Sequence, residues 1–235
     1  MSLKGMRVKP QTGMHYGNNR VEFDSPKNRC RITAQSLLEF MEYMRLELSP
    51  NVASYTPHPG FLIIQDDEKG EARSIFDAEV HMTDGRIIYE EIKYIDEVLN
   101  GTDADDPYRS KRQINVQQEW CIQHGYEYSL VTDEDLIRNC PAMFNNCVYI
   151  VQRLRPERIN DINMLRAKVA SVYSQIADMG GKAVISKLAA DLDDVDEVEE
   201  LLTAVCYLIK EGRIETDLEV KPLDLGSEVR ISAEA

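Results

Sequence analysis

The sequence lacks any apolar run of the length that a membrane-spanning helix requires, which is about 20 residues. Its N-terminal stretch, MSLKGMRVKPQTGMHYGNNR, also lacks the apolar core of a secretory signal peptide. Both absences predict a cytoplasmic protein without a membrane partner.

Cysteine and histidine are few and scattered. The 5 cysteines are odd in number and include no Cys-x-x-Cys pair, and the 4 histidines complete no zinc-binding pattern. Reduced thiols are therefore expected instead of a disulfide framework. Any metal would be held by oxygen ligands, which favours Mg²⁺ or Mn²⁺.

Positive charge is also in short supply. The 27 lysines and arginines are outnumbered by 41 aspartates and glutamates, which gives a net charge of −14. Nucleic-acid binding without sequence preference depends mainly on Lys and Arg neutralising phosphates, so this balance argues against it. A DNA enzyme remains compatible with the charge if partners deliver the DNA or a local basic patch holds it.

One local basic patch is present. Arg109, Lys111 and Arg112 begin a helix that the sequence predicts over residues 109–124. Cations at this end oppose the helix dipole, so a bound phosphate would stabilise both the helix and the charges. A solvated helix start is the equally simple alternative.

The length of 235 residues, 43% of them hydrophobic, suffices for a full core in one large or two modest domains. Apolar residues recur at i, i+4, i+7 and i+11 within residues 34–49, which predicts an amphipathic helix. Glu39 lies off this stripe, on a second, partly apolar face with Tyr43 and Leu46. We therefore expect Glu39 to look into the protein.

The clearest local signal is a β-hairpin. Strand-like runs over residues 74–82 and 86–95 flank Thr83-Asp84-Gly85, and Asp-Gly between alternating apolar residues is typical of a hairpin turn. Side chains alternate along a strand, so a slip of one residue moves each of them to the other face. The register therefore decides which polar groups meet.

Two registers are open. A two-residue loop would set Asp77 opposite Ile92 and point it away from Glu91 and Lys93. A three-residue loop would set Asp77 opposite Glu91, with Lys93 as the diagonal neighbour. Gly85 as the last loop residue favours the second register, because glycine reaches positive φ without steric cost.

The second strand of the hairpin is apolar on both faces, which is typical of a central strand in an α/β sheet. Glu91 and Lys93 would then be partly desolvated, and buried charges are rare unless they are paired or bound to something. A cross-strand charge cluster at a sheet edge is the simpler alternative.

The remaining pattern of the first 155 residues predicts an α/β fold with a mixed sheet flanked by helices. A strand over 61–65, a turn over 66–74 and an acidic loop over 96–107 surround the hairpin. The helix 109–124 ends at Gly125, a strand covers 126–132, and Asp133 caps a further helix. Residues 142–155 are expected to add an edge strand.

The last third of the chain changes to helices over 159–179, 182–192 and 196–212, followed by a β-ribbon over 213–220. This order predicts a winged helix-turn-helix. The third helix begins with acidic residues, whose field opposes phosphate, so protein is a better partner for it than DNA. The acidic residues are Asp196, Glu197, Glu199 and Glu200.

These elements predict four segments. Residues 1–29 form an N-terminal extension that is partly flexible, 30–155 the first domain, 156–225 the winged-helix-like domain and 226–235 a tail.

A helix with an acid, an aspartate on one strand, Glu-Ile-Lys on the next strand and a following helix resemble the PD-(D/E)xK nuclease superfamily, which has a restriction-endonuclease-like fold. More closely, the chain resembles the TnsA-like endonucleases of heteromeric transposons. The resemblance covers SLLEFMEYMRLELSPNVASYTPHP, FDAEVHMTDGRIIYEEIK and WCIQHGYEYSLVTDEDL, and it continues into the C-terminal helices. His58-Pro59 stands where relatives often have Gln-Pro, and Phe76 where many have proline or threonine.

The resemblance implies four catalytic residues, Glu39, Asp77, Glu91 and Lys93. The three acids would hold Mg²⁺ or Mn²⁺, and Lys93 would position or deprotonate the attacking water, which partial burial beside a metal favours by lowering the lysine pKa. DNA contacts are expected from Arg109, Lys111, Arg112, Gln113 and Gln117.

The activity implied is hydrolysis of double-stranded DNA at the 5′ ends of a transposon. The implied partners are a DDE-type, TnsB-like transposase and an AAA+, TnsC-like ATPase regulator. A stand-alone nuclease of phage or defence origin and a non-catalytic adaptor acting through its C-terminal domain remain the alternatives.

Overall fold

The computed structural model describes residues 2–7, 20–66, 70–101, 108–155, 159 and 161–233. The chain divides into two compact units. The first contains Met1–Tyr43 and Asn51–Leu136, and the second contains Met44–Pro50 and Ile137–Ala235. Of the N-terminal extension expected over residues 1–29, residues 1 and 8–19 lie outside the described residues.

The first unit is built on a mixed four-stranded sheet with the order β4-β7-β8-β9. Its strands are β4 (Val52–Pro57), β7 (Ala78–Met82), β8 (Ile87–Lys93) and β9 (Glu127–Thr132). The pairs β4–β7 and β7–β8 are antiparallel, whereas β8 and β9 are parallel. This confirms the prediction of an α/β unit with a mixed sheet in which the second hairpin strand is central.

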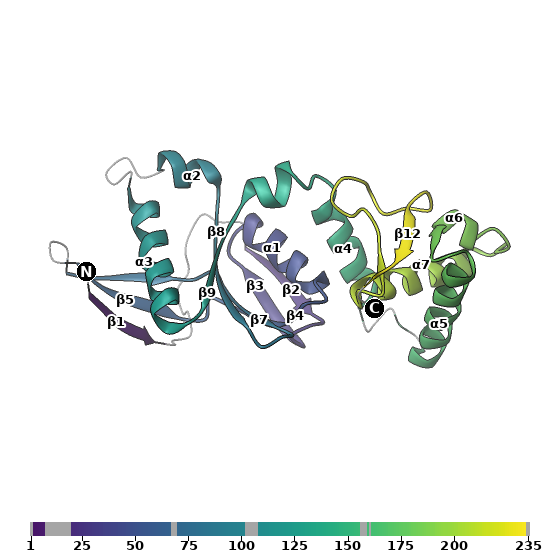
Figure 1. Cartoon of the computed structure of the whole chain (residues 1–235), viewed down its shortest axis with the longest axis horizontal. Helices are drawn as coiled ribbons and strands as arrows, with labels where there is room; N and C mark the ends of the chain where they lie inside the picture. The colour runs from purple at the N-terminus through teal and green to yellow at the C-terminus, as the bar shows by residue number, and fades with distance from the viewer. Residues whose placement is uncertain are drawn as a thin grey trace. The chain divides into compact units, whose positions relative to one another are not determined.

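Helices accompany this sheet along the chain (Figure 1). α1 (Leu37–Leu48) precedes β4, while α2 (Ile95–Asn100) and α3 (Arg109–His124) connect β8 to β9. α3 ends as predicted, because Gly125 adopts φ 73° and its N–H donates to the carbonyls of the last turn. Parallel neighbours need such a long crossover, and α3 supplies it.

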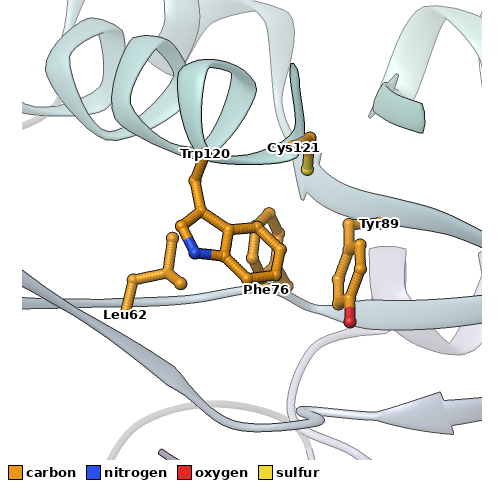
Figure 2. Close-up of a cluster of buried hydrophobic side chains, with 5 residues drawn as sticks. All are labelled: Leu62, Phe76, Tyr89, Trp120 and Cys121. Atoms are coloured by element: carbon orange, nitrogen blue, oxygen red, sulfur yellow. The ribbon is translucent and has the colours of Figure 1, made fainter. Parts of the chain in front are cut away.

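An aromatic cluster joins α3 to the sheet (Figure 2). Trp120 of α3 stands edge-on to Tyr89 of β8, with ring centroids 5.3 Å apart, and its centroid is 5.7 Å from that of Phe76. Phe76 has no exposed surface. Since Phe76 directly precedes Asp77, its burial anchors the chain at the position where the predicted site begins.

Two smaller sheets complete the first unit. β5 (Phe61–Asp66) lies between β1 (Ser2–Arg7) and β6 (Gly70–Ile75), and β2 (Val21–Ser25) pairs with β3 (Cys30–Ala34). The predicted turn over 66–74 is therefore wrong for most of its length. β6 pairs residue by residue with β5, and this pairing overrides the low strand preference of its sequence GEARSI.

Residues 142–155 form α4 (Met143–Arg153) and not the expected edge strand. The buried positions explain the error. Asn146, Cys147, Ile150 and Val151 are buried at helical spacing, although several residues of this segment are also common in strands.

Two further expectations near the sheet need correction. The acidic loop expected over 96–107 begins as α2, and residues 102–107 lie outside the described residues. The helix expected after Asp133 is a short π-helical turn, η1 (Glu134–Arg138). The Oδ1 atom of Asp133 accepts a hydrogen bond from the Ile95 N–H, 2.7 Å away, at the start of α2.

The second unit continues after α4 with α5 (Ile162–Asp178), β10 (Lys182–Val184), α6 (Ile185–Leu188) and α7 (Val195–Lys210). Asp161 caps α5 and Asp194 caps α7, each by accepting backbone N–H bonds. The predicted helix over 182–192 is thus divided into a strand and a short helix.

A small antiparallel sheet closes the second unit, with the order β10-β12-β11. β11 (Ile214–Glu215) lies in the predicted ribbon, but its partner β12 (Glu228–Ile231) lies in the segment that was expected to be a tail. The tail assignment is wrong because Val229, at the centre of β12, has no exposed surface and pairs with Ala183.

Among the helices of the described residues, none combines the length and the apolar character needed to cross a membrane.

Candidate active site

The hairpin register places the predicted residues together. Ala78 pairs with Glu90, Met82 N–H donates to Arg86 O over 2.9 Å, and Gly85 adopts φ 90°. This is the three-residue loop that the sequence favoured, so that prediction is confirmed. It puts Asp77 opposite Glu91 at the end of the paired region.

Asp77 is held by bonds from three sides. Its N–H donates to Glu90 O (2.9 Å), and its Oδ2 accepts from the Ile92 N–H (2.6 Å). Its carbonyl accepts from the Tyr43 hydroxyl of α1 (2.9 Å) and from the His58 N–H (3.0 Å). The carboxylate therefore reaches across to β8 while helix α1 and the end of β4 fix the backbone.

Glu91 is almost completely buried, with 1% of its surface exposed. Its Oε1 accepts from Lys93 Nζ and from Gln113 Nε2, each at 2.8 Å. Its Oε2 accepts from Gln117 Nε2 at 2.7 Å. The amide of Gln117 also donates to Ile75 O at 3.0 Å, so α3 holds Glu91 against the sheet.

Glu39 faces the interior as predicted, with 8% of its surface exposed. Ser36 and Glu39 form a helix-start arrangement in which Ser36 Oγ accepts from the Glu39 N–H (3.1 Å) and Glu39 Oε2 accepts from the Gln35 N–H (2.8 Å). The same Oε2 lies 3.3 Å from His58 Nε2. Glu39 thus serves the start of α1 and faces the site at once.

Burial is the largest influence on the pKa values of Asp77 and Glu91. It raises the pKa of Asp77 well above its usual range, and the negative charges of Glu91 and Glu39 add to the rise. Burial likewise raises the pKa of Glu91, against the opposing charge of Lys93. The positive charge of Lys93 thus opposes the rise at both acids without cancelling it.

Lys93 departs from the expectation of a lowered pKa. Burial works in that direction, but the carboxylates of Glu91, Asp77 and Glu97 outweigh it, and the net pKa of Lys93 is raised. Without a metal, Lys93 is therefore a charged ammonium group.

The residues predicted to contact DNA separate into two groups. Arg109, Lys111 and Arg112 are exposed in the first turn of α3, and Lys111 Nζ donates to Leu99 O at 3.1 Å. Gln117 has no exposed surface, so it cannot touch DNA directly.

The two glutamines instead position Glu91. Gln113 is partly buried and donates to one oxygen of the Glu91 carboxylate, whereas Gln117 donates to the other. The expectation that both read DNA is corrected for this reason: their amide groups are directed to a buried carboxylate.

Sequence reasoning missed two members of the site. The i+4 spacing places Tyr43 on the same helix face as Glu39, and this is the available signal. It does not indicate the hydrogen bond that the Tyr43 hydroxyl donates to the Asp77 carbonyl. His58 gave only the weak signal of a residue before Pro59-Gly60, because its closeness to Glu39 depends on how β4 follows α1.

The acids predicted to hold a metal ion, Glu39, Asp77 and Glu91, do not form one compact group in the described part of the chain. Within the described ranges, no group of three or more His, Cys, Asp or Glu side chains is close enough to hold a metal ion. The donors instead form two neighbouring pairs, Glu39 with His58 and Asp77 with Glu91.

Comparison with known proteins adds no assignment: no family model matches the chain, and no curated protein matches its sequence.

Proposed function

We propose that the chain is a metal-dependent DNA endonuclease of the PD-(D/E)xK type. The observation that carries the proposal is the meeting of Asp77, Glu91 and Lys93 at one end of the hairpin, with the helical acid Glu39 beside them. With β5, β6 and α2 set aside, the order α1, β4, β7, β8, α3, β9 supports the proposal, because a restriction-endonuclease-like core is expected to have a helix, three strands, a helix and a strand in this order.

The donor chemistry fits a hard divalent cation. Asp77, Glu91 and Glu39 supply carboxylate oxygens, which Mg²⁺ and Mn²⁺ prefer. The raised pKa of Asp77 comes from burial and then from neighbouring negative charge, and a cation would relieve the second cause. When bound, such a cation would lower the pKa of a water molecule and neutralise charge on the phosphate.

The residues of the chain supply the remaining functions. Lys93, charged and held by Glu91 at 2.8 Å, would stabilise the negative charge that develops on the phosphate. Gln113 and Gln117 fix the direction of the Glu91 carboxylate, and Tyr43 fixes the backbone of Asp77. Arg109 and Arg112 at the start of α3 would bind the phosphates of the flanking DNA.

The second unit supports the TnsA-like form of this proposal. Its order of helix α5, strand β10, helices α6 and α7 and strands β11 and β12 is compatible with the order expected of a winged helix. The acidic start of α7 favours docking to protein over DNA. In this reading the enzyme cuts the 5′ ends of a transposon alongside a DDE-type transposase and under an AAA+ ATPase regulator.

A nicking assay tests the proposal. Supercoiled plasmid and DNA carrying the ends found beside the gene are incubated with the chain and the products of its neighbouring genes, in Mg²⁺, in Mn²⁺ and with a chelator. Strand breaks that require the divalent ion are expected. Breaks that persist in the chelator would contradict a metal-dependent enzyme, and no breaks under any condition would favour the adaptor.

A further inference from the structure

His58 occupies an unusual backbone position beside the acids of the site. It follows β4 with φ 46°, in the left-handed region that most residues other than glycine avoid. Its N–H donates to Asp77 O at 3.0 Å, which helps to hold this conformation. Strained residues of this kind are concentrated at functional sites.

The imidazole of His58 is mostly buried, and its buried Nε2 atom lacks a hydrogen bond within the described part of the chain. Its side chain is 13% exposed, and among the described residues its Nε2 has no hydrogen-bond partner. That nitrogen lies 3.3 Å from Glu39 Oε2 without the geometry of a hydrogen bond. Buried polar atoms without hydrogen-bond partners are rare in proteins, and a bound ion is one explanation for such an atom.

The spacing of the two atoms suits adjacent ligands of one ion. Two donors about 2.1 Å from an octahedral ion and at right angles to each other lie about 3.0 Å apart. The Nε2–Oε2 separation of 3.3 Å is close to this value. The Asp77 carbonyl accepts the His58 N–H, and the Asp77 carboxyl is close enough to Glu39 for their negative charges to interact.

We infer that His58 supplies a nitrogen ligand to the divalent ion of the site, next to Glu39. This inference rests on the proposed endonuclease function. Imidazole is a good ligand for first-row transition ions, whereas Mg²⁺ binds oxygen and keeps much of its water. The site should therefore bind Mn²⁺ more tightly than a site with carboxylates alone, while Mg²⁺ gains little from His58.

Pulsed electron paramagnetic resonance of the Mn²⁺-loaded full-length protein tests this directly. Wild-type protein should show nitrogen coupling to Mn²⁺, and the coupling should change when the histidines carry ¹⁵N. His58→Asn should remove it and weaken Mn²⁺ binding by about tenfold, with Mg²⁺ binding changed much less. Asparagine tolerates the left-handed conformation, so the backbone is preserved.

His81→Asn is the matched control. His81 is on β7 and pairs with Glu79 at 2.7 Å, away from Asp77 and Glu39. It should leave the nitrogen coupling and both affinities unchanged. Circular dichroism checks that each variant is folded, and the labelled wild-type spectrum decides the question if His58→Asn is not.

Two results would overturn the inference, and only the second would also overturn the proposed endonuclease function. Mn²⁺ bound at a site that Asp77→Asn abolishes, but without histidine coupling, would remove His58 from the ligands and leave the endonuclease proposal standing. Failure of the protein to bind Mn²⁺ or Mg²⁺ at all would remove both.

Discussion

At the scale of single residues, Lys93 and Glu91 form a buried pair whose two charges depend on each other. Lys93 Nζ lies 2.8 Å from Glu91 Oε1, and its charge opposes the rise in the pKa of Glu91 that burial causes. Gln113 and Gln117 bind the same carboxylate, so Glu91 keeps hydrogen-bond partners if Lys93 is removed.

Lys93→Ala should therefore abolish cleavage and leave the fold intact. We expect a loss of about 100-fold or more in the nicking rate, because the variant lacks the charge near the phosphate. Nicking in Mg²⁺, resolved on a gel, measures this loss, and Lys187→Ala, which changes an exposed lysine of α6, is the control. Undiminished cleavage would take Lys93 out of the mechanism.

The raised pKa of Asp77 gives a prediction about stability. A carboxyl whose folded-state pKa is raised destabilises the fold once the pH exceeds its unfolded pKa, and the penalty is complete above the folded pKa. In chelator at neutral pH, Asp77→Asn should therefore raise the melting temperature, since asparagine can still accept the Ile92 bond.

The gain should shrink as the pH falls toward ~4, where unfolded aspartate takes up its proton. Thermal melts of both proteins between these pH values provide the test, and added Mg²⁺ should raise the melting temperature of wild type more than that of Asp77→Asn. A variant that melts below wild type in chelator at neutral pH would show that Asp77 is not under electrostatic strain.

At the scale of elements, the turn between β7 and β8 sets the site. Gly85 has φ 90°, and a Cβ added there would meet nothing within 4 Å, so only backbone strain opposes substitution. Gly85→Ala should destabilise the protein by about 1–2 kcal/mol, measured by urea unfolding. Gly85→Asn should cost less, because asparagine tolerates positive φ better. Equal stability of all three proteins would argue against a strained turn.

The same element explains what the sequence could predict. The Thr83-Asp84-Gly85 loop and strand alternation were enough to place Asp77 opposite Glu91, and the glycine at 125 was enough to end α3. Both are local signals, in which a few neighbouring residues determine the backbone.

The errors arose where distant pairing or packing decides. β6 is a strand because β5 lies beside it, and α4 is a helix because one of its faces is buried in the second unit. The sequence predicts a DNA contact for Gln117 because it does not reveal that the Gln117 amide binds the buried carboxylate of Glu91. His58 was overlooked for the same reason.

At the scale of the whole molecule, the net charge is −14, and the acidic residues differ in how far neighbouring cations neutralise them. At the start of α7, Glu199 Oε2 lies 2.8 Å from Arg153 Nη1, and Glu200 Oε2 lies 3.9 Å from Lys168 Nζ. These two acids are thus partly neutralised. Asp196 and Glu197 are both exposed and would contribute most to the field that repels phosphate.

The variant Asp196→Asn/Glu197→Gln tests the docking role of this helix. It should slow association with the proposed ATPase regulator by up to about tenfold at low salt, with a smaller effect at moderate salt, because complementary charge mainly speeds docking. Stopped-flow or surface binding measures the rate. Glu22→Gln/Asp24→Asn in β2 makes the same change in net charge and should have little effect. Tight binding of duplex DNA through the second unit would contradict the docking role and favour a DNA-binding role for this unit.

The central claim is that Asp77 and its neighbours hydrolyse DNA with a divalent ion, and one measurement tests it most directly. The rate of Mg²⁺-dependent nicking is compared between wild type, Asp77→Asn and Asp96→Asn, an exposed aspartate of α2, with the partner proteins present. The account predicts a loss of at least about 100-fold for Asp77→Asn and wild-type activity for Asp96→Asn. Nicking by folded Asp77→Asn at the wild-type rate would contradict it.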